Sequence, residues 1–542
     1  FDMLENSFGD EGGALVRAEN INTLGEVPNS SWFTNRIGVR DMTLEELVRG
    51  NDTVGPPDTS APLTVLRGGL GAISSGLVVR DQRGEPYYLV FDRKGFRNLG
   101  TGAAVVASKF FHAFGYNVLG ATIIHLDPKT FEIEPGAMIL QLGSGEVDLD
   151  REFIDLLLDE MEPNDDGLYR AVAYSLLESE SLGEFKFFGT RSDDPNDIFP
   201  HENRRELRGL RVFSAWLNNT LTRAINTRSF LVAENGRSFL KHYLVDFSTA
   251  LGSGWDLDDR LIPKDEWAGN EYTLLGDTLA SLKTAATLGI WTRPWLEIDY
   301  PYPEYAEIGR IEGDHFEPDI WKPDYPNPAF SRMLPDDAFW AAKIVARFSD
   351  EMIRAIVRTG QFSDPAAEEY LVQTLIKRRD KIVEYYFRDI NPLDEFRVEN
   401  GQLVFRNLGE DRGLATGTKY EHEWFVLDNQ TEELQVLTQR LLQSERRIDI
   451  PRTSTDYLTA RIRSRSVEQR RWKKNIDVTL RMDDPPVVVG VEREVGAFVL
   501  ERTLEGGYTT QSHLEFGGTY AGLEDDQQRL IDEYVRRLNE LT

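Results

Sequence analysis

The sequence predicts an α+β protein with an amino-terminal arm, two lobes and a β-rich carboxy-terminal domain. Three patterns favour this organisation: β-branched and aromatic runs beside a glycine-rich segment at residues 61–130, apolar stripes at helical spacing at 131–394, and runs that alternate between apolar and polar residues at 395–542. A chain of 542 residues, 40% of them hydrophobic, can form more than one core. Residues 1–60, rich in Gly, Asn, Pro and Asp, are the expected arm.

The arm contains the aromatic segment VPNSSWFTNRIG, residues 27–38. A turn is expected at Pro28-Asn29, followed by Trp32 and Phe33. We expect these two rings to pack against a neighbouring unit of the chain. An aromatic platform for a ligand is the alternative.

The first lobe, residues 61–130, has the order strand, glycine-rich loop, strand, strand, helix, strand. The expected strands cover residues 62–66, 77–81, 86–91 and 121–126, and the expected helix covers residues 102–114. The loop RGGLGAISSG includes Gly68, Gly69 and Gly71. A loop of this kind can bring its backbone close to a phosphate, so these glycines are the candidate cofactor-binding residues.

The second lobe, residues 131–394, is expected to be mostly helical. Its apolar stripes predict helices at residues 152–161, 204–223, 335–358 and 365–387. Residues 291–330 are rich in Trp, Pro and Tyr and are expected to wrap around this lobe.

The carboxy-terminal domain, residues 395–542, is expected to be a β-sandwich or barrel. FRVENGQLVFRNL, residues 396–408, alternates around Asn400-Gly401, which predicts a hairpin with a type I′ turn. Further alternating runs lie at residues 423–427, 457–462, 476–481, 487–491 and 497–502. A charged amphipathic helix is predicted at residues 523–541.

The stretch from Trp216 to Gly254 has the order and spacing of a protein-kinase catalytic core. A loop precedes two strands joined by Glu234-Asn235-Gly236-Arg237, and the second strand leads into Asp246-Phe247-Ser248. In kinases the loop H-R-D-x-x-x-x-N and the D-F-G segment supply the magnesium ligands. Asn226 and Asp246 fall at these two positions and carry the oxygen donors that Mg²⁺ prefers. A purely structural role, in which Asp246 caps a loop or pairs with Arg223 or Arg211, is the alternative.

The residues that transfer the phosphoryl group in kinases are replaced. Leu221 stands where the Asp that accepts the hydroxyl proton is expected. Val90 stands where a Lys should bind the phosphates, and Ala104 where its partner Glu should lie. Lys94 or Lys109 could supply the missing cation.

Several segments resemble an uncharacterised bacterial family with protein-kinase-like lobes. The similarity spans roughly residues 20–400 and includes VPNSSWFTNRIG, ASKFFHAFGYNV, DDPNDIFPHENRRELRGLRVFSAWLN, HYLVDFSTALGSG and YPNPAFSRM. The resemblance implies a bilobal protein-kinase-like fold. It also implies that relatives carry Lys, Glu and Asp at the positions of Val90, Ala104 and Leu221, which makes this chain a degenerate, pseudokinase-like member.

Composition excludes several classes of partner and site. A formal net charge of −30 argues against nucleic acid or an anionic lipid surface as the main partner. The absence of cysteine excludes disulfides and thiolate chemistry. The basic run at residues 461–474 is expected to be a solvated face or a docking edge for an acidic neighbour rather than a nucleic-acid site. No apolar run approaches the length of a membrane-spanning helix.

Other catalytic motifs fit less well. The seven histidines show no H-E-x-x-H or other paired spacing typical of zinc hydrolases. Asp256, Asp258 and Asp259 suggest calcium, but Arg260 and Leu261 follow where an oxygen ligand and a glycine are needed. Pairs of glycosidase carboxylates cannot be selected from 91 acidic residues by sequence alone.

The sequence therefore favours a catalytically inactive kinase-like protein that serves as a structural or accessory subunit of a bacterial envelope assembly. Its partners are expected to be other proteins, with no cofactor or only weakly bound Mg-ATP. Because the chain begins at Phe1, a cleaved signal peptide and a periplasmic or extracellular location are expected. The alternatives are a divergent ATP- and Mg-dependent phosphoryl or nucleotidyl transferase and, less favoured, a glycan binder that acts through the carboxy-terminal domain.

Overall fold

The structure is a computed structural model, and it consists of two units. It describes residues 16–69, 76–127, 129, 131–141, 145–220, 222–234, 236–255, 261–263, 287 and 304–495. Within these ranges, the first unit takes in Pro28–Arg332 and Lys343–Lys381, and the second takes in Val16–Val27, Met333–Ala342 and the chain from Ile382 onwards. The predicted strand at 497–502, the predicted helix at 523–541 and the acidic run at 256–259 lie outside the described residues.

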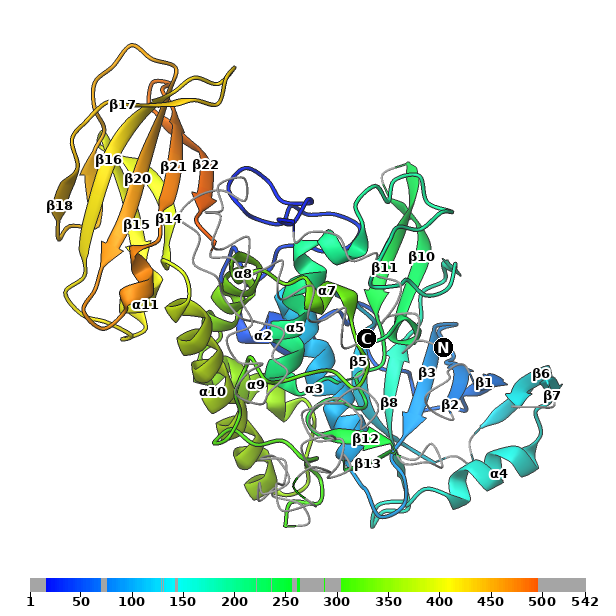
Figure 1. Ribbon diagram of the computed structural model, residues 1–542. Helices are drawn as coiled ribbons and strands as arrows, with labels where there is room; N and C mark the ends of the chain where they lie inside the picture. Colours follow the sequence, from blue (N-terminus) through cyan, green and yellow to red (C-terminus); the bar gives the residue numbers. More distant parts are fainter. Residues whose placement is uncertain are drawn as a thin grey trace. The chain divides into compact units, whose positions relative to one another are not determined.

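Seven strands form the main sheet of the first unit, in the order β5-β8-β3-β2-β1-β6-β7 (Figure 1). Their bounds are β1 (Thr64–Gly68), β2 (Gly76–Arg80), β3 (Pro86–Phe91), β5 (Ala121–Leu126), β6 (Glu132–Gln141), β7 (Gly145–Asp148) and β8 (Tyr169–Ser175). Neighbouring strands are antiparallel except β1 and β6, which run parallel. The four strands predicted between residues 62 and 126 are confirmed as β1, β2, β3 and β5.

The sheet continues through β8, in a region that the sequence predicted to be mostly helical. That prediction is wrong for residues 169–175. Ala171, Val172, Ala173 and Tyr174 are all buried, so both faces of β8 are covered. A strand buried on both faces shows no alternation of apolar and polar residues, and the pattern could not separate it from a helix.

Two helices cover the two faces of β3. Its residues Tyr87, Leu89 and Phe91 share a core with α4 (Arg151–Asp159), whereas Val90 shares a separate cluster with α3 (Leu99–Phe114). This division follows from the alternation of side chains along a strand. The predicted helix at 102–114 is confirmed as α3, with its start three residues earlier.

The rest of the first unit is largely helical and holds a hairpin. Its remaining elements are α2 (Leu44–Arg49), β4 (Asn117–Val118), β9 (Glu180–Ser181), α5 (Arg205–Leu217), β10 (Thr227–Glu234), β11 (Arg237–Leu244), β12 (Ser253–Trp255), β13 (Leu261–Pro263), α7 (Pro328–Ser331) and α9 (Asp350–Arg358). The strands β4, β11, β10 and β9 form a four-stranded sheet in that order. The predicted hairpin that leads to Asp246 is confirmed as β10 and β11.

Two predicted helices have different ends from those expected. The helix at 204–223 stops at Leu217, because Asn218 adopts a left-handed backbone with φ of 47° and caps the helix. The helix at 335–358 is two helices, α8 (Pro335–Ala346) and α9. Ser349 separates them, since its side chain accepts a hydrogen bond from the Met352 amide and starts α9. The helix predicted at 365–387 is confirmed as α10 (Pro365–Arg388).

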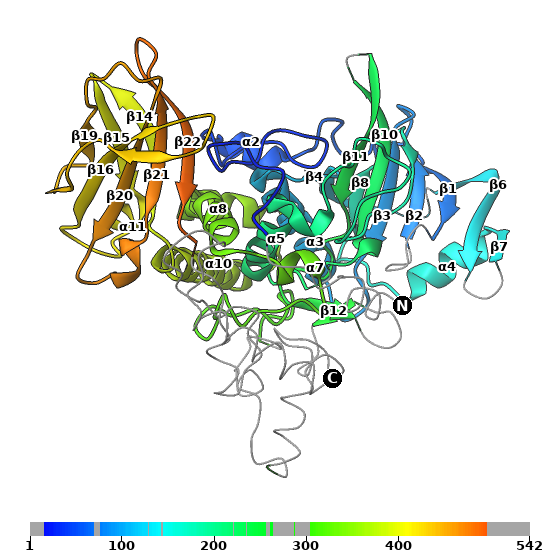
Figure 2. The same ribbon diagram turned by 45° about the horizontal axis from the view of Figure 1, so that its top comes forward.

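In the second unit two antiparallel sheets enclose one core (Figure 2). One sheet contains β14 (Leu393–Glu399), β15 (Gln402–Asn407) and β19 (Arg447–Asp449). The other contains β16 (Lys419–Leu427), β17 (Leu434–Val436), β18 (Leu441–Gln443), β20 (Tyr457–Arg465), β21 (Ile476–Arg481) and β22 (Val487–Arg493), and α11 (Leu408–Asp411) follows β15. Asn400 and Gly401 both have positive φ, as the predicted type I′ turn requires.

Candidate functional site

Asn226 and Asp246 lie together at one small cavity of the first unit. Asn226 ends the turn before β10, and Asp246 follows β11 by two residues. The Val245 amide donates to the Asn226 carbonyl at 2.9 Å, which ties the two ends of the hairpin together. Both side chains line a cavity of about 10 Å³. The structure therefore brings together the two residues that the sequence selected as candidate magnesium ligands.

Asp246 is held by its own loop. Its Oδ1 accepts hydrogen bonds from the Ser248 amide at 3.1 Å and from the Ser248 hydroxyl at 2.6 Å. Burial raises the pKa of Asp246, and the Ser248 hydrogen bonds and the charges of Arg223 and Arg228 oppose that shift. The residue has a φ of 62°, a conformation that Asp tolerates better than most side chains do. These contacts are those of a loop cap, the structural alternative considered for this residue.

Asn226 is different, because its carboxamide has no partner. The residue is 5% exposed, and neither Oδ1 nor Nδ2 forms a hydrogen bond within the described part of the chain. Around the same cavity, Asn219 Oδ1, Thr222 Oγ1 and Arg223 Nε are also buried without a partner. A cavity of about 10 Å³ has room for roughly one water molecule. As bounded by the described residues, it fits a water or a single ion but not a nucleotide phosphate.

Val90 and Ala104 lie in one hydrophobic cluster. Val90 on β3 is 4% exposed and Ala104 on α3 is fully buried. Val105, Val172 and Tyr174 belong to the same cluster, as do Ala121 and Ile123. The two residues that the sequence comparison aligned with the Lys and Glu of kinases therefore share one apolar cluster.

Neither substitute cation is shown at the cavity. Lys109 is buried, and its ammonium donates to the Arg49 carbonyl at 2.6 Å. Burial lowers the pKa of Lys109 to about 8, and the charge of Asp52 partly offsets this effect. Lys94 is exposed in the turn that follows β3. Lys109 is thus engaged beside α2.

The glycine-rich loop is described only at its start. Gly68 ends β1, and a side chain at this position would meet Ile139 and Leu149. Gly69 has a positive φ of 64°, and its amide donates to the Gly76 carbonyl at 3.0 Å. Gly71 and Leu221 lie outside the described residues. The two glycines that the structure describes serve the turn between β1 and β2.

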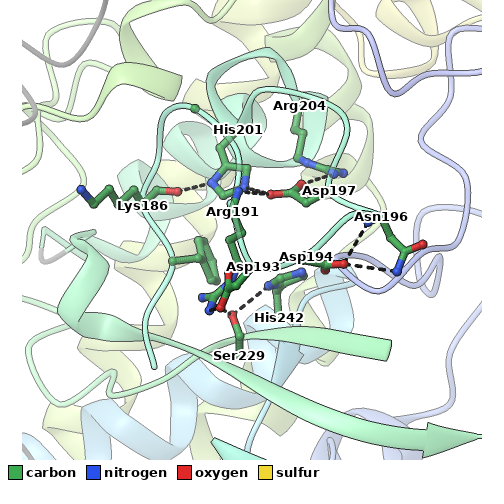
Figure 3. Close-up of polar contacts among 12 residues, drawn as sticks. Lys186, Arg191, Asp193, Asp194, Asn196, Asp197, His201, Arg204, Ser229 and His242 are labelled. Atoms are coloured by element: carbon green, nitrogen blue, oxygen red, sulfur yellow. Dashed lines mark hydrogen bonds and ion pairs between the residues drawn. The ribbon is translucent and has the colours of Figure 1, made fainter. Parts of the chain in front are cut away.

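A buried ionic cluster that the sequence did not reveal lies near the β10–β11 hairpin (Figure 3). Asp197 accepts from His201 Nε2 at 2.6 Å and from Arg204 at 2.9 Å, and the Arg191 amide also donates to it. Burial alone would raise the pKa of Asp197, but these hydrogen bonds lower it to about 2. His201 Nδ1 contacts the Lys186 carbonyl. Both ring nitrogens of His201 therefore lie within hydrogen-bond distance of oxygen atoms, one of a carbonyl and one of a carboxylate.

The aromatic arm joins this cluster. Trp32 stacks on His242, with ring centroids 3.7 Å apart, and it contacts His201 edge-on at 4.6 Å. His242 Nδ1 and the Ser229 hydroxyl share a hydrogen bond of 2.9 Å, as Figure 3 shows. The Phe33 ring is fully buried beside Tyr116. The expectation that the arm packs against a neighbouring unit is confirmed for both aromatic residues.

This cluster unites three of the segments that carry the family resemblance. Asp197 and His201 are four residues apart, and that spacing was the one local signal available. The contact of His242 with Trp32 joins residues 210 positions apart and depends on the hairpin. Within the described residues, no group of three or more His, Cys, Asp or Glu side chains has an arrangement that could hold a metal ion. The cluster ties the arm to the hairpin.

Comparisons with known proteins show distant similarity to kinase structures. The chain is similar to the Helicobacter pylori proinflammatory kinase CtkA, with 13% identity and a TM-score of 0.32 over 61% of this chain and 96% of the other. It is also similar to the Golgi casein kinase and to its Mn/ADP complex, each with 9% identity over 63% of this chain and 74% of the other, at TM-scores of 0.29 and 0.30. No protein-family model and no curated protein matches the chain.

Proposed function

We propose that the chain is a kinase-like protein without phosphotransfer activity, which serves as a structural or accessory subunit of a bacterial envelope assembly. The observation that carries this proposal is the shared apolar cluster of Val90 and Ala104. Phosphoryl transfer depends on positioned charges that neutralise the phosphates. An apolar contact at the position of that ion pair cannot supply them.

The order of the elements supports the kinase-like part of the proposal. The first unit contains strand, loop, strand, strand and helix as β1, β2, β3 and α3, and later a hairpin that leads to Asp246. Asn226 and Asp246 then lie at one cavity, as the kinase analogy predicts. The order of the strands and helix is therefore that expected of a kinase-like protein. Apolar residues stand at the two positions, Val90 and Ala104, that the sequence aligns with the Lys and Glu of kinases.

Two features support the accessory role, the anchored aromatic arm and the second unit. The aromatic arm is anchored by Trp32 and Phe33, and the second unit adds two sheets around a core of its own. The envelope location is part of the proposal, and a chain without cysteine is compatible with it. No helix among the described residues is long and apolar enough to cross a membrane.

The test is a transfer assay with ATP labelled at the γ-phosphate, in the presence of Mg²⁺ or Mn²⁺. The purified chain is incubated alone and with a bacterial envelope fraction, beside the variant Asp246→Asn. The proposal predicts no metal-dependent labelling by either protein. Labelling by the natural chain that is lost in the variant would overturn it.

The alternative function is a divergent ATP-dependent transferase, and one observation favours it. The unpartnered carboxamide of Asn226 belongs to the cavity that Asp246 also lines. These two side chains could supply oxygen ligands to a metal ion, whose chemistry would be to neutralise phosphate charge. The transfer assay decides between this alternative and the non-catalytic role.

A further inference from the structure

The basic run of the second unit divides into two parts with different environments. In β20, Arg461 forms two hydrogen bonds with the Asp477 carboxylate, at 2.8 and 2.7 Å. Arg463 and Arg465 both contact the Glu421 carboxylate. This part of the run is a ladder of ion pairs across neighbouring strands. It corresponds to the solvated face that the sequence allowed, and each of its three arginines contacts a carboxylate within the unit.

The second part of the run leaves the sheet after β20. Trp472 is fully buried, and its indole donates to the Phe387 carbonyl at 2.7 Å. This anchor fixes the turn Arg470–Lys473, while Arg470, Arg471 and Lys473 stay exposed. Arg471 pairs with Asp389. Arg470 has no hydrogen-bond or ion-pair partner in the described part of the chain, so its charge is open to a ligand.

A cavity of about 420 Å³ lies between this turn and the end of α10. Tyr385, Arg388 and Asp389 line it from α10 and the residue that follows, and Val467, Arg470 and Arg471 line it from the opposite side. We call it the Val467 pocket. Val467 is 92% exposed, although removal of a valine side chain from water is favourable. The volume lies in the range of sites that bind a small molecule or a few side chains.

Charge indicates what such a ligand would be. Three arginines line the Val467 pocket against two carboxylates, Asp389 and Glu468. One carboxylate is already paired with Arg471, and Arg388 pairs with Glu384 outside the pocket lining. The Glu468 carboxylate accepts hydrogen bonds from the Ser466 and Thr416 hydroxyls, so Arg470 is the charged lining residue left without any partner in the described part of the chain. The lining residues together carry a net charge of +1, on a chain whose formal net charge is −30. Such a site favours an acidic ligand, which the rest of the surface repels.

We propose that the Val467 pocket binds an acidic segment of a partner protein, with an apolar side chain of that segment against Val467 and Tyr385 and a carboxylate at Arg470. The two contacts are complementary, because the apolar side chain would remove Val467 from water and the carboxylate would pair with the open guanidinium. This inference rests on the proposed accessory role, because that role requires a protein partner. It adds that the partner carries an acidic segment with an apolar side chain.

The test uses a fluorescently labelled peptide of glutamates interspersed with leucines, titrated with the full chain and followed by fluorescence anisotropy. We expect Arg470→Glu and Val467→Asp each to weaken binding about tenfold or more. Arg452→Glu is the matched control: Arg452 is an exposed arginine of the second unit outside the pocket, and its reversal should leave binding within about twofold. Both test positions are exposed, and unchanged melting temperatures would show that the variants fold.

Three results would overturn the proposal. The first is equal weakening by Arg452→Glu, which would show attraction to charge alone. The second is equal binding of a peptide with serine in place of each leucine, which would remove the role of Val467. The third is tighter binding of a single-stranded oligonucleotide that the two pocket variants abolish, which would assign the pocket to phosphates. Phosphoryl transfer by the first unit would contradict the proposed function without affecting this measurement, and failure of the peptide to bind would leave the proposed function standing.

Discussion

Val90 on β3 and Ala104 on α3 belong to the same buried hydrophobic cluster. In a kinase these two elements carry a phosphate-binding Lys and its partner Glu. The contact between strand and helix is kept here, but it is made by packing instead of charge. Val90 and Ala104 therefore supply apolar contacts and no charge at this place in the first unit.

A single charge introduced at Val90 or Ala104 should destabilise the folded chain. Val90→Lys or Ala104→Glu places an unpaired charge in an apolar cluster and is expected to lower the free energy of unfolding by roughly 3 to 5 kcal/mol. The double variant should recover part of this loss, because the two charges can pair. Urea denaturation measures all three variants. Val39→Lys, at a surface valine, is the control, and single variants that match its stability would show that the cluster admits water.

Asp246→Asn separates a loop cap from a metal ligand. Because burial raises the pKa of Asp246, the folded state binds a proton more tightly than the unfolded state, and ionisation of this group lowers stability as the pH rises. Asparagine removes that effect, tolerates positive φ and can still accept a hydrogen bond from Ser248. We expect the variant to be at least as stable as the natural chain at neutral pH. A lower stability that appears only when Mg²⁺ is present would contradict the cap.

Arg378 should be essential to the loop that carries Asn219 and Asn226. It is fully buried, stacks on Phe316 at 3.6 Å and donates to the carbonyls of Ala215, Trp216 and Glu312. The first two carbonyls belong to the last turn of α5, where carbonyls lack partners from within the helix, and the Ala215 carbonyl also accepts from the Asn218 amide at 3.4 Å.

Arg378→Met keeps much of the side-chain volume but leaves these carbonyls unsatisfied. The expected loss is roughly 3 to 5 kcal/mol in the free energy of unfolding, measured by urea denaturation. Lys377→Met, next to it and half-exposed, removes only an ion pair with Asp314 and should cost less than about 1 kcal/mol. Equal losses in the two variants would show that Arg378 does not hold the end of α5.

His242 should make the chain sensitive to acid. Burial, reinforced by the charge of His201, lowers its pKa to about 3, from about 6.5 in an unfolded chain. Between these values the unfolded state binds the extra proton, so this contribution is complete above pH 6.5 and is lost as the pH falls towards 3, at about 1.4 kcal/mol per pH unit.

His242→Phe keeps a ring against Trp32 and should reduce this slope by about one proton. The remaining slope includes His112, whose pKa is also lowered to about 3, chiefly by burial. Denaturation between pH 7 and 4 measures the effect. His315→Phe, at an exposed histidine, is the control, and an unchanged slope in His242→Phe would show that His242 titrates normally when folded.

Much of the fold could be predicted because local patterns determine it. Asn400-Gly401 predicts its turn through backbone preferences alone, and the alternation on either side of it predicts β14 and β15. The pattern failed where burial hides it. β8 is covered on both faces and shows no alternation, and the end of α5 depends on a left-handed Asn218 that no apolar stripe reveals.

The candidate site was predictable only in part. The spacing of Asn226 and Asp246 around a hairpin placed them at one cavity, because the hairpin fixes the distance between its ends. The Asp197, His201 and His242 cluster depends on contacts among the arm, a loop and β11, and no local spacing encodes such contacts. The position of the Lys109 ammonium at the Arg49 carbonyl likewise required the structure.

The central claim, that the first unit no longer holds a nucleotide, is tested most directly by thermal unfolding of the full chain with ATP, with and without Mg²⁺ or Mn²⁺, beside Asp246→Asn. A ligand that binds only the folded state stabilises it by about 2.7 kcal/mol at a hundred times its Kd. If the first unit holds no nucleotide, the melting temperature of either protein should not change at millimolar ATP. A metal-dependent rise that Asp246→Asn abolishes would contradict the account and favour the transferase.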